Sequence, residues 1–210
     1  MIVRRMVAGF CLFCFAFAVK MEKPMDAWTV EPFPGSLTGK TIIVTQKIWD
    51  EGTLTRSEPE GPLWPEIVFA LRCLRNELPD VRAKVEYGSA YSAAVILPDQ
   101  ETKGRLLENA WRFGLIADGK PEETGERVLL RYVGPIHAAA MRALDMDLET
   151  YLLFLRRAGR AVLNRNGRAV AWIIRVPEGE AVSFTLPEGA AWEISGDSAG
   201  GVIIAVRSGC

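Results

Sequence analysis

The spacing of apolar residues changes near Gly159, from helical spacing before it to alternating spacing after it. Apolar side chains at 63–78 recur every three or four positions, which predicts a helix with one buried face. Asp99 is expected to cap a second helix that ends at Gly114, because aspartate accepts from free N–H groups at a helix start and glycine suits the left-handed C-terminal position. Further helices are predicted over 136–144 and 148–157, and strands over 41–48, 81–87, 93–97 and 128–133.

After Gly159 the pattern predicts short strands, over 161–163, 168–176, 181–186, 191–194 and 202–206. Asn166-Gly167 is typical of the tight turn between two antiparallel strands. The string GDSAGG at 196–201 is similar to the serine-protease nucleophile motif, but no histidine and aspartate context supports a triad, so it is predicted to be a glycine-rich hairpin turn. The predicted fold class is α+β, with a small antiparallel sheet and flanking helices over 39–159, followed by a small all-β C-terminal subdomain over 160–210.

Residues 1–18 have the pattern of a secretory signal peptide, with two arginines, an apolar run and the small-x-small cleavage pattern Ala16-Phe17-Ala18. We therefore expect export to the cell envelope or beyond, and a mature chain that begins at Val19. An uncleaved membrane anchor is the alternative, although the apolar run is shorter than the roughly 20 residues that usually span a bilayer. A lipoprotein signal at Cys14 is a third option, which the bulky Phe13 before it disfavours.

The composition is that of a globular protein of 210 residues, of which 49% are hydrophobic and 24% are charged. This length accommodates one packed domain and a small appendage, and residues 19–38, with several prolines and no sustained period, are predicted to be a linker. The formal net charge of -1 argues against a nucleic-acid binder. After cleavage, Cys73 and Cys210 remain, either as a buried thiol and a free terminal thiol or as a disulfide.

The stretch from 105 to 152 carries framework motifs, which are clearest at 107–114, 119–125 and 131–138. The last of these contains the string RYVG, followed by His137. On these residues the chain resembles the C-terminal half of the zinc D-alanyl-D-alanine carboxypeptidases, which trim bacterial cell-wall peptides. In that family, a motif of the type SxHxxGxAxD supplies a zinc histidine and aspartate, and a motif of the type EPWHxRYVG supplies the catalytic glutamate and another zinc histidine.

Laid without gaps on this chain, the two family motifs fall on 89–98 and 126–134. Glu126 matches the family's general-base glutamate. The three positions where the family has zinc ligands carry other side chains, namely Tyr91, Pro98 and Leu129. The resemblance therefore implies a degenerate member in which Glu126 is a vestige and zinc, the family's cofactor, is not expected.

The composition also argues against a metal, because zinc is held by Cys, His, Asp or Glu and catalytic sites use three such ligands with one position left open. His137 is the one histidine of the chain, and it falls at a framework position of the family rather than at a ligand position. The sequence contains no HxxxH or HExxH spacing and no pair of CxxC motifs, since Cys11 and Cys14 lie in the N-terminal apolar run. We therefore expect His137 to be structural.

Three functional hypotheses follow. The first is an exported, catalytically inactive relative that binds peptidoglycan stem peptides or a cell-envelope protein through an apolar cleft. The second is an active peptidoglycan D,D-carboxypeptidase with a non-standard site, for which Glu126, Asp99 and Glu86 are the candidate carboxylates. The third is an adhesion or assembly module that uses the subdomain at 160–210. Contact with a membrane is expected only through the N-terminal segment if it stays uncleaved.

Overall fold

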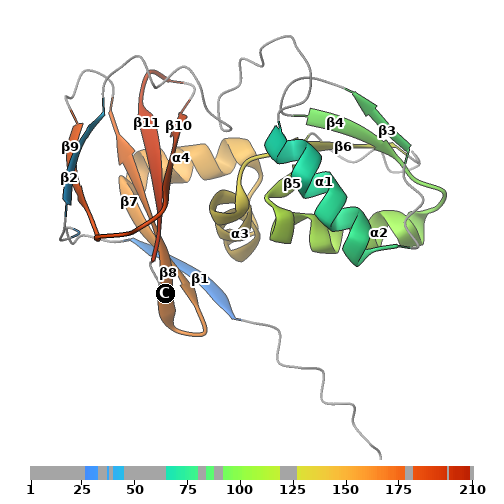
Figure 1. The fold of residues 1–210 in the computed structure, drawn as a ribbon, viewed down its shortest axis with the longest axis horizontal. Helices are drawn as coiled ribbons and strands as arrows, with labels where there is room; N and C mark the ends of the chain where they lie inside the picture. Colours follow the sequence, from blue (N-terminus) through green and yellow to red (C-terminus); the bar gives the residue numbers. More distant parts are fainter. Residues whose placement is uncertain are drawn as a thin grey trace, which may run out of the picture.

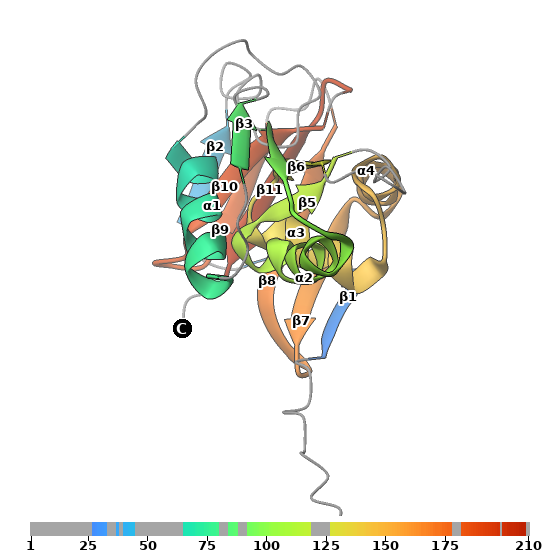
Figure 2. The same cartoon turned by 90° about the vertical axis from the view of Figure 1, so that its right-hand side faces the viewer.

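The structure is a computed structural model that describes residues 27–32, 37, 40–44, 65–79, 84–87, 92–118, 127–177, 182–197 and 199–208. Within these residues, the chain forms a four-stranded and a five-stranded antiparallel sheet with helices packed on each, and a two-stranded sheet (Figure 1). Figure 2 looks from the side of the four-stranded sheet, so that this sheet and its helices lie in front. The predicted α+β class is confirmed. None of the described helices is long and apolar enough to span a membrane, and the predicted signal peptide lies outside the described residues.

The four-stranded sheet has the order β3 (Lys84–Tyr87), β4 (Ser92–Ile96), β6 (Arg127–Tyr132) and β5 (Leu115–Ala117). One face is covered by α1 (Pro65–Glu77), α2 (Gln100–Ala110) and the short 3-10 helix η2 (Trp111–Phe113). Of the apolar side chains predicted to face the core, Ile67 and Leu74 are buried and share a core cluster with Val95 and Leu130 of the sheet. Ala70 joins this cluster, whereas Val68, also predicted to face the core, is 40% exposed. Burial of this cluster holds the helix on the sheet, since each large aliphatic side chain that is buried contributes about 1.5–3 kcal/mol.

The ends of the second helix follow the chemistry expected from the sequence. Asp99 accepts a hydrogen bond from the Thr102 N–H at 2.7 Å, which satisfies one of the free donors of the first turn. Gly114 ends η2 at a φ of 79°, and a Cβ there would lie 2.8 Å from the carbonyl carbon of Gly134, so only glycine fits. The next strand, β5, was not predicted, because three residues are too few to show a period.

The five-stranded sheet has the order β1 (Trp28–Pro32), β7 (Arg160–Arg165), β8 (Arg168–Val176), β11 (Val202–Arg207) and β10 (Trp192–Gly196). Helices α3 (Pro135–Leu144) and α4 (Leu148–Ala158) cover one face, where Met141 and Leu155 share a core with Ile173 and Ile203. Asn166 and Gly167 have φ values of 52° and 74°, so they form the predicted two-residue turn. A separate two-stranded sheet pairs β2 (Lys40–Val44) with β9 (Val182–Leu186).

The N-terminal part of the domain organisation differs from the expectation. Trp28–Pro32 lie within the segment 19–38 that the sequence predicts to be a linker, yet they form β1 and pair with β7, with Val30 opposite Leu163. The partner strand is far along the chain, so no local pattern reveals this pairing. The expected boundary at residue 159 also falls inside one core, because α3 and α4 pack against β7 and β8. The C-terminal strands therefore rely on these two helices to cover one face.

A buried carboxylate organises the GDSAGG segment, which forms the predicted hairpin turn between β10 and β11. The side chain of Asp197 is fully buried, and it accepts from Arg175 Nε at 2.7 Å and from the N–H groups of Ala199 and Gly201, each at 2.8 Å. Arg156 of α4 donates to the backbone carbonyl of Asp197 at 2.7 Å. Burial by itself raises the pKa of Asp197, but the hydrogen bonds from Arg175 and the two amides outweigh it, so the net pKa lies below its usual value.

We expect Asp197→Asn to lower the free energy of unfolding by about 3 kcal/mol at neutral pH, because it removes the negative charge beside Arg175 and turns one of two acceptor oxygens into an NH2 group that faces a donor. Asp145→Asn, an exposed matched control in a left-handed position that asparagine tolerates, should change the free energy by less than about 0.5 kcal/mol. The Asp197 contribution is present above the ordinary aspartate pKa and is lost as the pH falls through the lowered pKa of the folded state. Urea denaturation at several pH values measures the stability loss and its pH dependence. Equal free energies of unfolding for Asp197→Asn and Asp145→Asn would contradict the role of Asp197.

The one histidine of the chain is part of the core, as expected for a structural residue. His137 in α3 is almost fully buried, and its Nδ1 forms a hydrogen bond of 2.9 Å with the hydroxyl of Tyr151 in α4. The two rings also meet edge to face, with centroids 5.9 Å apart. Burial lowers the pKa of His137 to about 3 and raises the pKa of Tyr151, so both side chains are neutral at physiological pH.

This burial predicts a dependence of stability on pH. The unfolded chain takes up a proton on His137 below about pH 6.5 whereas the folded chain does not, so stability is complete above this pH and falls as the pH drops toward 3. Between pH 6.5 and 5 this residue should cost the wild type about 2 kcal/mol. The variant His137→Gln, which cannot take up this proton, should lack that part of the loss in denaturant titrations, although it starts from a lower stability. Identical pH slopes for both proteins would refute the linkage.

Candidate functional site

The candidate site is the face of the four-stranded sheet that points away from α1 and α2. Along β4 and β6, alternate residues such as Val95 and Leu130 belong to the core under the helices. The residues between them point to the opposite face, where Ala94 and Leu129 are register partners. Leu129 stands where the resemblance places a zinc histidine. It therefore lies on the face of the four-stranded sheet that α1, α2 and η2 do not cover.

On the neighbouring strand β4 this face is apolar beside Leu129, whereas Arg127 and Arg131 flank Leu129 along β6. The leucine is 39% exposed, while Ala94 opposite it is buried. Ile96 is the diagonal neighbour of Leu129 on the same face, because it pairs with Arg127, two residues before Leu129. None of these three side chains carries an atom that binds a metal ion.

Pro98 is not brought next to Leu129. It follows the end of β4 and is exposed, four residues beyond Ala94, the register partner of Leu129. Four residues of extended chain span about 13 Å, whereas zinc ligand atoms lie about 2 Å from a shared ion. The residue that the register places opposite Leu129 is Ala94, and Ile96 is a diagonal neighbour. The sequence alone did not single out Ile96, because the ungapped alignment contains no information on where the strand ends.

The other predicted site residues are dispersed or lie outside the described residues. Tyr91 and Glu126 are outside the described part of the chain. Glu86 belongs to β3, where its backbone pairs with Ala94. The carboxylate of Asp99 is engaged at the start of α2, where the hydrogen bonds from Thr102 lower its pKa. Of the three candidate carboxylates, Asp99 alone has a described side chain.

One ionic contact at the β5–β6 edge was missed from the sequence. Arg131 Nη1 lies 3.7 Å from Asp118 Oδ2, and the Asp118 N–H donates to the carbonyl of Leu129 at 2.8 Å. Arg131 is 4% exposed, so this contact holds a largely buried guanidinium. Asp118 follows the unpredicted strand β5, which is why no sequence signal identified it. Within the described part of the chain, no three His, Cys, Asp or Glu side chains gather closely enough to hold a metal ion.

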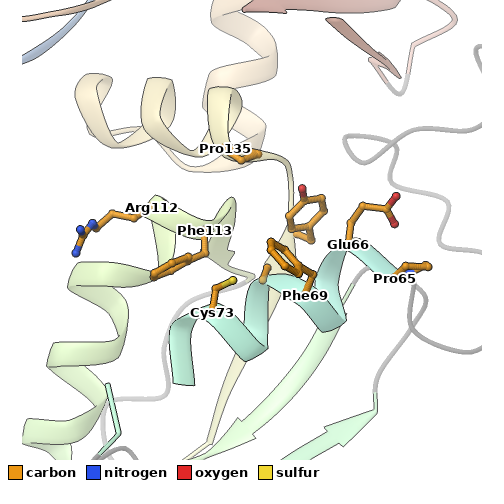
Figure 3. A pocket seen from close by; sticks show the side chains of 9 residues that line it. Pro65, Glu66, Phe69, Cys73, Arg112, Phe113 and Pro135 are labelled. Atoms are coloured by element: carbon orange, nitrogen blue, oxygen red, sulfur yellow. The ribbon is translucent and has the colours of Figure 1, made fainter. Parts of the chain in front are cut away.

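A groove of about 400 Å³ lies between α1, η2 and the start of α3, and we call it the aromatic groove (Figure 3). Its apolar wall is formed mainly by three rings, those of Phe69, Phe113 and Tyr132. Phe69 is 67% exposed, which is unusual for a phenylalanine on a packed helix. Figure 3 shows Glu66 and Arg112 at opposite ends of this groove. The arrangement offers an apolar middle, a carboxylate at one end and a guanidinium at the other.

The polar groups of the aromatic groove are suited to a ligand with its own charge. Arg112 donates to Glu77, and the remaining N–H groups of a guanidinium can serve a second acceptor. Burial raises the pKa of Tyr132 to about 12, with contributions from the carboxylates of Glu193 and Glu66. Its phenol is therefore protonated at neutral pH and remains a hydrogen-bond donor. Cys73, the free thiol of α1, also lines this groove, while Cys210 lies outside the described residues.

Comparison with known proteins gives two similarities. No protein-family model matches the chain. A D-alanyl-D-alanine carboxypeptidase of Enterococcus faecium is 33% identical over 110 residues, which are 50% of this chain and 36% of that protein. The chain therefore matches about a third of the length of this relative.

The fold is similar to a solved structure, the crystal structure of the vancomycin-resistance D,D-dipeptidase VanXYg in complex with a D-Ala-D-Ala phosphinate analogue. The TM-score is 0.66 at 15% sequence identity, and the match covers 80% of this chain and 99% of that one. At this identity the match shows a shared fold. The sequence similarity and the shared fold support kinship with the zinc D,D-peptidase family.

Proposed function

We propose that this protein is an exported D,D-peptidase-like protein that does not hydrolyse peptides through zinc and instead binds cell-wall peptides. The observation that carries the proposal is the position of Leu129, partly exposed and flanked by Ala94 and Ile96 on the face where the resemblance expects metal ligands. The export part is proposed from the pattern of residues 1–18.

The chemistry of zinc hydrolysis explains why these residues argue against turnover. A catalytic zinc needs three strong protein ligands and an open position for the water that it activates. Leucine, isoleucine and proline supply no ligand atom, so the described residues of this face do not fit the metal of the family. A general base at Glu126 would then have no activated water to use.

The aromatic groove is the surface that we assign to peptide binding. Its rings suit the methyl groups of alanyl residues, and Arg112 suits the terminal carboxylate of a peptide such as one ending in D-alanyl-D-alanine. Tyr132 adds a protonated phenol at the same wall. A groove with a small number of polar groups around an apolar middle is the usual form of a small-ligand site.

An adhesion function carried by residues 160–210 alone is less compatible with the packing. The inner face of the five-stranded sheet is covered by α3 and α4, and β1 supplies one of its edges. These elements lie before residue 160, so a fragment of 160–210 would expose the apolar face that they bury. Loss of binding in that fragment would therefore say nothing about a function of the intact sheet.

We expect the purified protein to bind no stoichiometric zinc and to release no D-alanine from a peptide that ends in D-alanyl-D-alanine. Atomic absorption after dialysis against zinc measures the first quantity, and chromatographic detection of D-alanine measures the second. Turnover that disappears in the variant Glu126→Gln would overturn the proposal and favour the active-enzyme alternative.

Rebuilding a metal site tests whether the β4–β6 face has the geometry of one. The pair Ile96→Asp and Leu129→His places two ligands on diagonal neighbours of one face, about 7 Å apart. The matched pair Pro98→Asp and Leu129→His places the same ligands farther apart. We expect the first double variant to bind zinc at least about tenfold more tightly, measured by competition with a chromophoric chelator. Equal affinities would show that this face is not the metal face.

Peptide binding should depend on Arg112 and Phe69. We expect Arg112→Gln to weaken the binding of a peptide ending in D-alanyl-D-alanine by about tenfold, because a charge-assisted hydrogen bond to the carboxylate is lost. Phe69→Asp should weaken it similarly, by removing an apolar wall and adding a negative charge. The matched control is Arg75→Gln, because Arg75 is an exposed arginine on α1, the helix that carries Phe69. Calorimetric titration gives the affinities, and equal binding of the C-terminally amidated peptide would contradict the role of Arg112.

A further inference from the structure

A second cavity, of about 650 Å³, lies between the start of α3 and the end of the five-stranded sheet that carries the β7–β8 turn. Figures 1 and 2 show β1, β7 and β8 side by side at this end of the molecule. Three arginines line the cavity, Arg165 and Arg168 on either side of the turn and Arg207 at the end of β11, and we call it the cationic cavity. Its apolar wall includes Trp28 and Ile136.

The walls of the cationic cavity are fixed by contacts that do not involve a ligand. The N–H of Ala27 donates to the Asn166 side chain at 2.9 Å, and the Asn166 N–H donates to the Ala27 carbonyl at 2.7 Å. These two bonds tie the start of β1 to the β7–β8 turn and hold Trp28 beside it. The edge-to-face contact of Trp28 with Trp111, with centroids 5.9 Å apart, fixes the ring from another side.

One arginine is held in place by this ring. The guanidinium of Arg165 lies over the indole of Trp28, 5.4 Å from its centroid, which is the geometry of a cation–π contact. A stacked guanidinium loses less freedom when it binds an anion, because its orientation is already restricted. The cavity therefore has a preorganised cation next to an aromatic surface.

The side chains that line the cavity carry positive charge. None of the described lining residues is acidic, although the whole chain has a formal net charge of -1. Glu193 of the neighbouring strand β10 interacts with Arg207 and does not line the cavity. Pro135 and Ile136 place the start of α3 at the same cavity, and the positive end of a helix dipole adds to the attraction for an anion.

We propose that the cationic cavity binds a small anionic ligand, in which a phosphate or carboxylate group is attached to an apolar ring or chain. The three arginines provide planar donors that match either anion, and Trp28 with Ile136 receives the apolar part. This site is separate from the aromatic groove, and the inference does not depend on the proposed peptide binding.

The test uses calorimetric titration of the full-length protein with three probes: phenyl phosphate, phenylacetate and phenol. We expect one or both anions to bind and phenol to bind at least about tenfold more weakly, because it lacks the charge. A preference for phenyl phosphate would identify the ligand group as a phosphate, and a preference for phenylacetate would identify it as a carboxylate. No binding of either anion up to about 10 mM would overturn the proposal.

Two exposed arginines give the matched comparison. Arg168→Gln should weaken anion binding about tenfold, whereas Arg72→Gln on α1, far from the cavity lining, should leave it unchanged. Arg165→Lys keeps the charge but loses the planar donor, so it should fall between wild type and Arg168→Gln. Circular dichroism and melting temperature confirm that each variant is folded. Equal affinity of Arg168→Gln and Arg72→Gln for phenyl phosphate and phenylacetate would refute the site.

Discussion

Helix α3 joins the two halves of the molecule, because it is buried along most of its length between them. Every residue from Ile136 to Met141 is buried, and the helix contacts β5 and η2 on one side and β1 and β11 on the other. A helix that is buried all round needs small or apolar side chains in every direction, and three consecutive alanines at 138–140 meet this need. Its histidine is hydrogen-bonded through Nδ1 to Tyr151, while Nε2 has no hydrogen-bond partner among the described residues.

The position of this helix also determines both cavities. Pro135, its first residue, lines the aromatic groove and the cationic cavity alike. The chain reaches this point through Gly134, where a Cβ would lie 3.0 Å from a carboxylate oxygen of Glu193, and Gly114 packs against the same peptide. The close approach of these backbones explains why the RYVG segment is a framework motif. This segment positions α3, and α3 in turn lines both cavities.

The sequence predicted some features of the candidate site and not others. The predicted strands of the metal motifs exist, and their register puts Leu129 on the face away from the helices. The register also shows that Pro98 lies past the end of β4 and that Ala94 lies opposite Leu129, with Ile96 diagonal to it. An ungapped alignment assumes that each strand has the same length as its counterpart in the family. Where the lengths differ, positions that are aligned by residue count are not neighbours in the sheet. Neither the aromatic groove nor the cationic cavity has a sequence signature, because each combines residues from distant elements.

The sequence by itself determined the elements whose signals are local. The period of three or four at 63–78, the cap at Asp99 and the Asn166-Gly167 turn each specify their own backbone, and all three are present in the structure. Tertiary structure alone decided the pairing of β1 with β7, the strand β5 and the core that α3 shares with the C-terminal sheet. Each of these is stabilised by burial and hydrogen bonds between segments that are far apart in the chain, and such contacts leave no period in either segment.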